Sequence, residues 1–410
     1  MKNWENYLFS IAFLAALFVF AILSAVRTVP VLSENVSAYF KTEPEDGVSD
    51  AVKNTLLQVD DDISKNVYNR YGFIEAYGEV NRLLGKKEIN GFSYALDKNG
   101  AYNSVNFWDE VNDIDIRRLT QQMVNLKDKT EENGGKFMFL AFPNKFDPAW
   151  NEGYEGIPYN DHNCKTDEML LWCRRYGIDN IDFRETLKNS GLSFNEMFYK
   201  TDHHWTGYAA FLAYVEMVDY MNEKFDAGLD PDHFYRDINN YNVEWVDDCL
   251  LGASGRSVGM AFGNTGLEDF QILYPKYSNN IEWDNYKVVA KGDYQDTLIH
   301  NKELEFQNPY DSDAYGYYVG GIYRRERIDN KDNPDGPKVL MIRDSFASPM
   351  LVEMTPLFST IECVWGKYAA DGYIESLVES GEYDYVIVAY YPEDIQENFF
   401  KFYKDVYKTD

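Results

Sequence analysis

Histidine, cysteine and positive charge are all scarce in this chain of 410 residues, which holds five histidines, four cysteines and 39 basic residues. Against those stand 68 acidic residues, so the formal net charge is −29. Because binding to phosphate or to anionic lipid surfaces needs a cationic face, this balance excludes nucleic acid as a partner and argues against adsorption to such lipids. The hydrophobic content of 45% is enough for a substantial core, so a folded protein is expected.

The four cysteines, Cys164, Cys173, Cys249 and Cys363, lack the spacing of a metal site. Cys164 and Cys173 are close enough in sequence to pair across a short loop if the compartment oxidises thiols. Buried thiols are the equal alternative. The disulfide state therefore stays open at this point.

One long apolar run is present, at residues 8–26, where nineteen consecutive residues carry no charge. This length matches the ~20 residues that span a bilayer core, whereas a cleavable signal has a shorter apolar region of ~7–15. Leu23-Ser24-Ala25 is only a poor cleavage site. We therefore expect an uncleaved N-terminal transmembrane anchor at residues 1–29. Lys2 and Arg27 flank the run and do not decide its orientation.

After the anchor we expect a tether and lead-in helices at residues 30–90, with residues 30–49 as the tether and helical spacing from 50 to 86. The catalytic domain would take up residues 91–410. Within it, residues 230–335 are rich in Asp, Asn, Tyr and Gly and predict an irregular, partly β insertion that packs over the site.

Strand and helix patterns alternate through the rest of the domain, which predicts an α/β fold with a parallel sheet flanked by helices. Residues 92–107 read as a hairpin. The expected strands are 136–142, 180–183, 338–342, 359–365 and 384–390; the expected helices are 113–132, 166–175, 184–190, 205–224, 371–380, one after Ser345 and a last one from about 393.

Two of the five histidines lie in the run from Tyr199 to Gly207, beside Asp202 and Trp205. A carboxylate and an imidazole this close can act as the orienting group and the base of a nucleophilic enzyme. In the plainer interpretation Asp202 only caps the helix that follows, and His203 and His204 are surface residues of its first turn.

The best nucleophile lies far downstream, where the strand at 338–342 runs almost directly into Ser345. Asn144 also lies just past a strand end. Because ligands sit beyond the carboxyl ends of parallel strands, the two residues can share one rim. Alone, Ser345 would more often be an ordinary turn serine.

Taken together, Tyr-x-Thr-Asp-His-His-Trp-Thr at 199–206 and Asp-Ser-Phe-Ala at 344–347 resemble the DHHW family. These are relatives of the alginate O-acetylation proteins with an SGNH-hydrolase-like (flavodoxin-like) fold. Three further segments agree with the family, at residues 73–85, 139–145 and 315–321. The resemblance runs from about residue 70 to the C-terminus.

The resemblance implies a catalytic triad in which Ser345 is the nucleophile, His204 rather than His203 is the base, and Asp202 orients it. It implies O-acetyl transfer onto a cell-surface or secreted polysaccharide through an acyl-serine, by an anchored extracytoplasmic domain. A membrane-bound O-acyltransferase would supply the acetyl groups. No cofactor and no metal are expected.

The acyl-transfer oxyanion needs hydrogen-bond donors. We expect one from the backbone N–H of Ser345 at a helix start, and a second from Asn144 or from the Gly320-Gly321 loop. Trp205 would pack beneath the histidine or, less simply, stack on a sugar. Arg343 stands where many relatives have glycine, so it departs from the family pattern.

Three alternatives remain open. The same acyl-serine could pass to water, which would make the protein an acetylesterase. A metal-dependent hydrolase would use Asp202, His203 or His204 and a distant ligand such as His162 or His233, although adjacent histidines lack the i, i+4 spacing that shares a helix face. A silent glycan-binding protein on the same fold is the third possibility, since fold does not fix function.

Overall fold

The computed structural model describes residues 2–39, 48–105, 114–159, 162–306 and 308–404, which form two compact units, Met1–Tyr77 and Gly78–Asp410. Three expectations fall partly outside these residues: the tether at 40–47, the end of the hairpin at 106–107, and the first residue, 113, of an expected helix.

The first unit is helical, with α1 (Lys2–Tyr39), α2 (Val48–Lys65) and the start of α3 (Arg70–Leu83). Within α1, Trp4–Asn35 is long and apolar enough to cross a membrane, with a mean hydropathy of 2.6 and none of that window buried. Residues 30–39, expected as the start of the tether, continue α1, with Pro30 inside the helix. Asn35 donates to the Asp62 carboxylate of α2 at 3.0 Å, which joins the two helices.

The second unit is built on an eight-stranded sheet in the order β5-β4-β13-β11-β12-β10-β8-β9. Its first five strands are parallel, as expected. The other three are antiparallel and come from the insertion, so the insertion extends the sheet as well as covering it. The strands are β4 (Lys136–Ala141), β5 (Asp179–Asp182), β8 (Ile281–Asp284), β9 (Val289–Gly292), β10 (Arg325–Asn330), β11 (Lys338–Arg343), β12 (Thr360–Trp365) and β13 (Tyr385–Tyr390).

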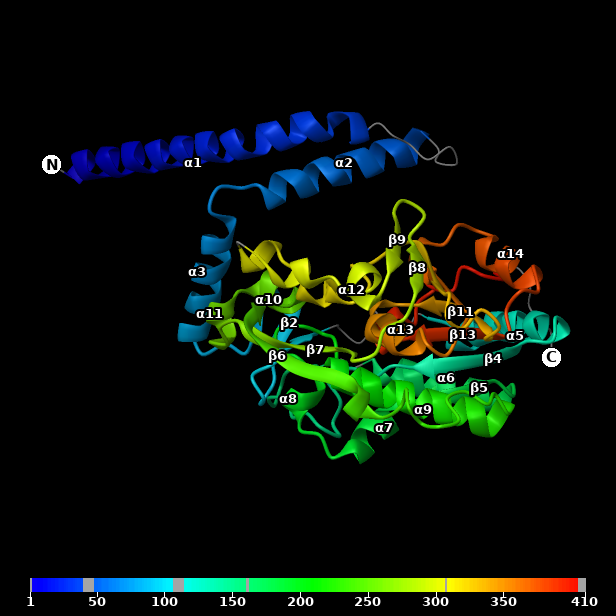
Figure 1. Ribbon diagram of the computed structural model, residues 1–410. Helices are drawn as coiled ribbons and strands as arrows, with labels where there is room; N and C mark the ends of the chain where they lie inside the picture. The colour runs from blue at the N-terminus through cyan, green and yellow to red at the C-terminus, as the bar shows by residue number, and fades with distance from the viewer. Residues whose placement is uncertain (1, 40–47, 106–113, 160–161, 307, 405–410) are drawn as a thin grey trace. The chain divides into compact units, whose positions relative to one another are not determined.

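The central strands are apolar on both faces because each face is covered by helices. Phe137 and Phe139 of β4 pack on one side with α5, α6 and α14, while Met138 and Leu140 pack on the other with α7, α9 and α13. These helices are α5 (Ile116–Glu132), α6 (Asn163–Arg175), α7 (Phe183–Ser190), α9 (Gly207–Phe225), α13 (Ser348–Met354) and α14 (Tyr373–Glu379). Figure 1 shows β4, β13 and β11 running side by side in this unit.

Two smaller sheets complete the unit. The expected hairpin forms part of a three-stranded sheet, β1 (Glu88–Ile89), β2 (Tyr94–Leu96) and β3 (Tyr102–Ser104). In the insertion β6 (Tyr241–Leu250) pairs with β7 (Glu268–Pro275). Short helices connect these parts: α8 (Phe194–Met197), α10 (Ala253–Val258), α11 (Met260–Gly263) and α12 (Tyr294–Thr297).

One expectation about the chain needs correction, and one open question about its cysteines is decided. The last helix, expected from about 393, is only a 3₁₀ turn at Pro392–Asp394. Further on, Phe399 and Phe400 pack against Tyr390, whose hydroxyl donates to the Phe399 carbonyl, so burial of side chains overrides helical spacing. Of the two alternatives left open for Cys164 and Cys173, the structure contradicts the disulfide, since both are thiols. Both lie on α6, where nine residues at 1.5 Å each separate them by about 14 Å, beyond disulfide reach.

Candidate active site

Ser345 begins a helical stretch directly after β11, at the carboxyl edge of the sheet. The preceding Asp344 is fully buried, and its carboxylate accepts from the backbone N–H of Phe346 at 2.9 Å and of Tyr391 at 2.6 Å. Asp344 therefore ties the serine turn to the end of β13. Ser345 is partly exposed among buried neighbours, so its hydroxyl can meet a ligand.

The histidine loop lies between α8 and α9 and is closed at its base by an isolated β-bridge between Phe198 and Trp205. The helix α9 begins at Gly207 and is capped by Thr206, whose hydroxyl accepts from the N–H of Ala209. Asp202 is therefore not a helix cap, and its carboxylate is left for another use.

The structure brings Asp202, His204 and Ser345 together. The Asp202 carboxylate lies 2.6 Å from His204 Nδ1 and also accepts the His204 backbone N–H at 3.0 Å. On the other side of the ring, His204 Nε2 lies 2.6 Å from the Ser345 hydroxyl oxygen. Serine, imidazole and carboxylate thus form one continuous hydrogen-bonded line across 143 residues of sequence separation, from 202 to 345.

The Asp202 carboxyl is 2% exposed. Burial alone would raise its pKa, but the His204 and His203 rings and the hydrogen bonds from His204 hold that pKa well below its usual range. The second carboxylate oxygen accepts the Ala253 N–H at 2.8 Å. Asp202 is therefore an ionised group that fixes the ring orientation and favours a proton on Nδ1.

Gly252 lets the insertion approach the triad loop. A Cβ placed there would lie 2.3–2.5 Å from the backbone nitrogen, Cα and Cβ of Asp202, which is far inside contact distance. Because two of these three are main-chain atoms, the loop itself would have to move. Glycine at 252 is thus required by the close packing of the insertion against Asp202.

Two charged side chains hold the backbone of the histidine loop, and the motif analysis gave neither a role. The ammonium of Lys145 donates to the carbonyls of Lys200 at 3.0 Å and of Asp202 at 2.6 Å. From the insertion, Glu268 accepts the N–H of Lys200 at 2.7 Å and of Thr201 at 2.6 Å, together with the Thr201 hydroxyl. The one available sequence signal was a lysine, Lys145, shortly after the apolar strand at 136–142.

Tyr315 forms a wall of the site that sequence reasoning also missed. Its ring is stacked on the His204 imidazole, with 3.7 Å between ring centroids and 9° between planes. Sequence analysis singled out the loop at 315–321 but assigned the function to its glycines. The contact of this loop with His204 comes from the Tyr315 side chain.

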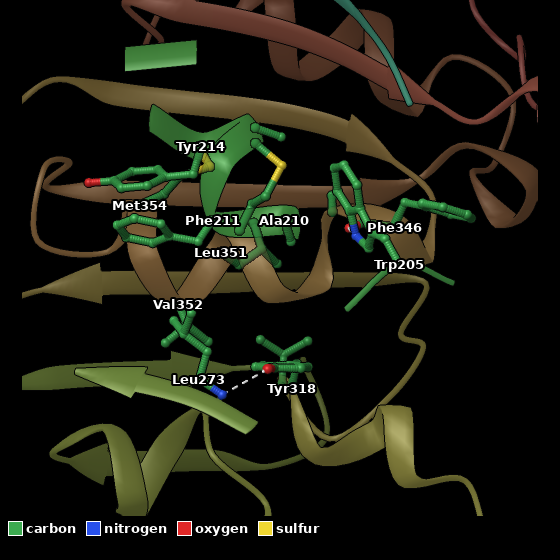
Figure 2. Close-up of a cluster of buried hydrophobic side chains, with 14 of the residues drawn as sticks. Trp205, Ala210, Phe211, Tyr214, Leu273, Tyr318, Phe346, Leu351, Val352 and Met354 are labelled. Atoms are coloured by element: carbon green, nitrogen blue, oxygen red, sulfur yellow. Dashed lines mark hydrogen bonds between the residues drawn. The ribbon is translucent and has the colours of Figure 1, made fainter. Parts of the chain in front are cut away.

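Trp205 packs beneath the histidine loop and is fully buried. Its indole N–H donates to the Phe346 carbonyl at 3.0 Å, and its ring meets Phe142 edge-on at 5.2 Å. Figure 2 shows Trp205 beside Phe346 within the cluster that also holds Phe211 and Tyr214. The indole therefore has no face for a sugar, and the packing interpretation is favoured.

The contacts of Arg343 and Gly320 are with other residues than Asp202, His204 and Ser345. The Arg343 guanidinium is 1% exposed, forms an ion pair with Glu326 and donates to the Ser348 hydroxyl at 3.0 Å. Its position is structural, so the departure from the family pattern does not alter the site. Gly320, by contrast, lies against His300 and Tyr323.

Asn144 is buried just past β4, where its side-chain oxygen accepts the Phe146 N–H at 2.9 Å. This contact commits the oxygen and leaves the amide nitrogen as the group able to donate. Neither that nitrogen nor the backbone N–H of Ser345 has a hydrogen-bond partner among the described residues. Both groups are therefore available as donors.

The ligand atoms of Asp202, His203 and His204 lie within 4.8 Å of one another, which is close enough for a metal ion. However, both ring nitrogens of His204 already have partners, Asp202 and Ser345. The Nδ1 atom of His203 lies 3.5 Å from the Asp202 carboxylate, but within the described residues no contact links His233 to this group. The geometry fits a proton-transfer line better than a metal site.

Comparison with known proteins bears on the fold of the chain. Residues 108–240 match the family model described as SGNH hydrolase-like domain, acetyltransferase AlgX. No curated protein matches the chain. Among solved structures, PatB1 of Bacillus cereus has a TM-score of 0.60 at 17% identity, covering 75% of this chain and 99% of its own. A DHHW family protein from Eubacterium siraeum has a TM-score of 0.56 at 16% identity, covering 77% and 96%.

At such low identity the structural matches establish the fold, and the family match supports enzymatic activity. The chain thus has the SGNH-hydrolase-like fold, and the resemblance to the DHHW family and to relatives of the alginate O-acetylation proteins, expected from its motifs, is confirmed.

Proposed function

We propose that this protein is a membrane-anchored, extracytoplasmic O-acetyltransferase that acetylates a cell-surface or secreted polysaccharide through an acetyl-serine at Ser345. The observation that carries the proposal is the line from Asp202 through His204 to Ser345, with 2.6 Å at each step. Support also comes from the family match to an acetyltransferase domain and from the apolar helix at Trp4–Asn35.

In the first half-reaction the Ser345 oxygen attacks the carbonyl carbon of a donor acetyl ester while His204 Nε2 takes the hydroxyl proton. Asp202 accepts the Nδ1–H and stabilises the imidazolium that forms. Collapse of the tetrahedral intermediate breaks the bond to the donor oxygen. That leaving oxygen receives the proton from His204, and the acetyl group stays on Ser345.

In the second half-reaction His204 removes the proton from a sugar hydroxyl, whose oxygen attacks the acetyl-serine carbonyl. Collapse then returns the proton to Ser345 and releases the O-acetylated sugar. If water takes the place of the sugar, the product is acetate and the enzyme is an esterase. Tyr315 covers one face of the imidazole, which limits the directions from which water reaches it.

The developing oxyanion needs donors fixed in advance. The Ser345 N–H stands at the start of the helical run that continues into α13, where the helix end favours negative charge. We assign the second donor to the amide nitrogen of Asn144, because its oxygen is already bound by Phe146. Within the part of the chain that the structure describes, Gly320 and Gly321 make no contact with Asp202, His204 or Ser345, so they are the weaker candidates.

The apolar helix supports the membrane assignment, and the family resemblance supports the partner assignment. A single apolar helix at the N-terminus would keep the domain next to a membrane-bound O-acyltransferase, which would deliver acetyl groups to Ser345. This partner is inferred from the family resemblance. Loss of polysaccharide acetylation in cells carrying a form without residues 1–39, and its retention with an unrelated anchor, would support the assignment.

The decisive experiment measures acetyl-serine directly. Purified protein is exposed to 4-nitrophenyl acetate, quenched in acid and examined for an acetylated Ser345 peptide by mass spectrometry. We expect acetylation of wild type, and Ser345→Ala to lower turnover by about 10³-fold or more. Undiminished turnover by this variant would refute the triad. Glycan affinity without acetylation of Ser345 would instead favour a silent binding protein.

The metal alternative has its own test. Metal analysis before and after dialysis against a chelator would reveal an ion held by Asp202 and the two histidines. We expect turnover of the acetyl ester to be unchanged by chelation. Loss of activity on chelation, restored by added zinc, would require the metal-dependent hydrolase.

A further inference from the structure

A pocket of about 880 Å³ lies against the histidine loop. None of Asp202, His204 and Ser345 lines it. Its volume falls within the roughly 300–1,000 Å³ of small-molecule sites. Four stretches of the chain line it, at residues 99–100, 195–200, 245 and 263–269. The proposed reaction assigns it no role.

The pocket combines an exposed aromatic ring with polar side chains. Trp245, on β6, is 44% exposed although large apolar side chains in this unit are mostly buried. Asn195 and Asn264 also line the pocket, and neither side chain has a hydrogen-bond partner among the described residues. An aromatic face with neighbouring amides suits a sugar ring, which offers apolar C–H faces and hydroxyl groups.

The charge of the pocket narrows the class of sugar that it can bind. Its lining contains three carboxylates, Glu196, Glu268 and Asp269, against the single ammonium of Lys200. Since like charges repel, a polymer with a carboxylate on each sugar would be disfavoured here, and the whole-chain charge of −29 acts in the same direction. The pocket suits a sugar without acidic groups.

The pocket also shares a wall with the catalytic loop. Lys200 and Glu268 line it, and Glu268 binds the N–H groups of Lys200 and Thr201, immediately before Asp202. A glycan bound in the pocket would therefore contact the same side chains that hold the triad loop in place.

We propose that this pocket is a saccharide subsite that binds neutral or amino-bearing sugar units of the acceptor polysaccharide, with Trp245 as the stacking platform and Asn195 and Asn264 as hydroxyl-binding groups. The proposal rests on the proposed function, because it identifies part of the acceptor site. It makes the acceptor a glycan without carboxylates.

The test is calorimetric titration of the full chain in a non-glycosidic detergent with three hexasaccharides: cellohexaose, a glucosamine hexamer and a galacturonate hexamer. We expect binding of cellohexaose or the glucosamine hexamer and weaker or no binding of the galacturonate hexamer. Trp245→Ala should lower at least tenfold the affinity for the hexamer that binds, while the unfolding midpoint of the variant stays that of wild type. Phe234→Ala, which removes another ring of 44% exposure outside this pocket, should bind as wild type does.

Equal binding by Trp245→Ala and wild type would overturn the subsite, as would failure of wild type to bind either non-acidic hexamer at millimolar concentration. Preference for the galacturonate hexamer would overturn the charge argument. These outcomes are independent of the acetyl-serine measurement. Titration of Ser345→Ala, which keeps the pocket intact, should give wild-type affinity and so separates failure of the subsite from failure of the catalytic proposal.

Discussion

Tyr315 lies flat on the imidazole of His204, with 3.7 Å between the ring centroids. Both ring nitrogens of the same imidazole are held by hydrogen bonds, Nδ1 to Asp202 and Nε2 to Ser345. Hydrogen bonds hold the ring within its plane, and stacking limits its tilt out of that plane. The position of the histidine is thus determined by the insertion as well as by the histidine loop.

The stacking predicts a specific pattern of substitutions. Tyr315→Ala should lower kcat for an acetyl ester about 10–100-fold, because a base displaced by a fraction of an ångström transfers protons less well. Tyr315→Phe, which keeps the ring, should retain most of the activity. Steady-state kinetics of both variants provide the measurement. A phenylalanine variant as slow as the alanine variant would mean that the hydroxyl, and not the stacked ring, is what matters.

A methyl group at position 252 should damage the site without touching the serine. In Gly252→Ala the new Cβ meets the Asp202 main chain at 2.4–2.5 Å, so the loop must shift and the carboxylate moves away from His204. We expect at least a 100-fold loss of kcat together with a lower melting temperature. The matched control is Gly316→Ala, whose Cβ would meet Glu303 at an ordinary 3.4 Å. Wild-type kinetics for Gly252→Ala would contradict the close approach.

The α/β pattern and the parallel sheet follow from the alternation of apolar strands and helices along the sequence. The grouping of Asp202, His204 and Ser345 was expected from the resemblance of two motifs to the DHHW family. Apolar strands and the two motifs carry those signals over a few residues each. The antiparallel strands β10, β8 and β9 do not, because their short mixed sequences become strands only through pairing: β10 with β12, β8 with β10, and β9 with β8. Contacts made by Glu268 and Tyr315 depend on how the insertion folds back, which no spacing along the chain reveals.

The pH dependence of stability should report on Lys145. Burial lowers the pKa of its ammonium from 10.5 to about 8, even though nearby carboxylates act in the opposite direction. Between pH 8 and about 10.4 the unfolded chain therefore binds more protons at this residue than the folded chain does. Folding becomes more favourable as pH rises through that window, by up to about 1.4 kcal/mol per pH unit.

Comparison with Lys145→Met isolates this contribution, since methionine has no proton to lose. The variant should be less stable at every pH, because two loop carbonyls lose their donor. Its deficit relative to wild type should widen from pH 8 to pH 10 in urea unfolding and stay constant below pH 7. A deficit that is the same at pH 7 and pH 10 would show that the lysine titrates normally in the fold.

Arg343 offers the clearest separation of structural from catalytic roles. Its guanidinium and the Glu326 carboxylate are each 1% exposed and form an ion pair, and Glu326 also accepts the Trp283 indole N–H at 3.0 Å. Arg343→Met should cost about 3–5 kcal/mol of unfolding free energy, because it leaves a buried carboxylate without its cation. The double variant with Glu326→Gln should recover part of that loss, since glutamine needs no counter-charge. Folded Arg343→Met should keep the wild-type KM for an acetyl ester, whereas a raised KM with unchanged stability would instead place the guanidinium among the substrate-binding groups.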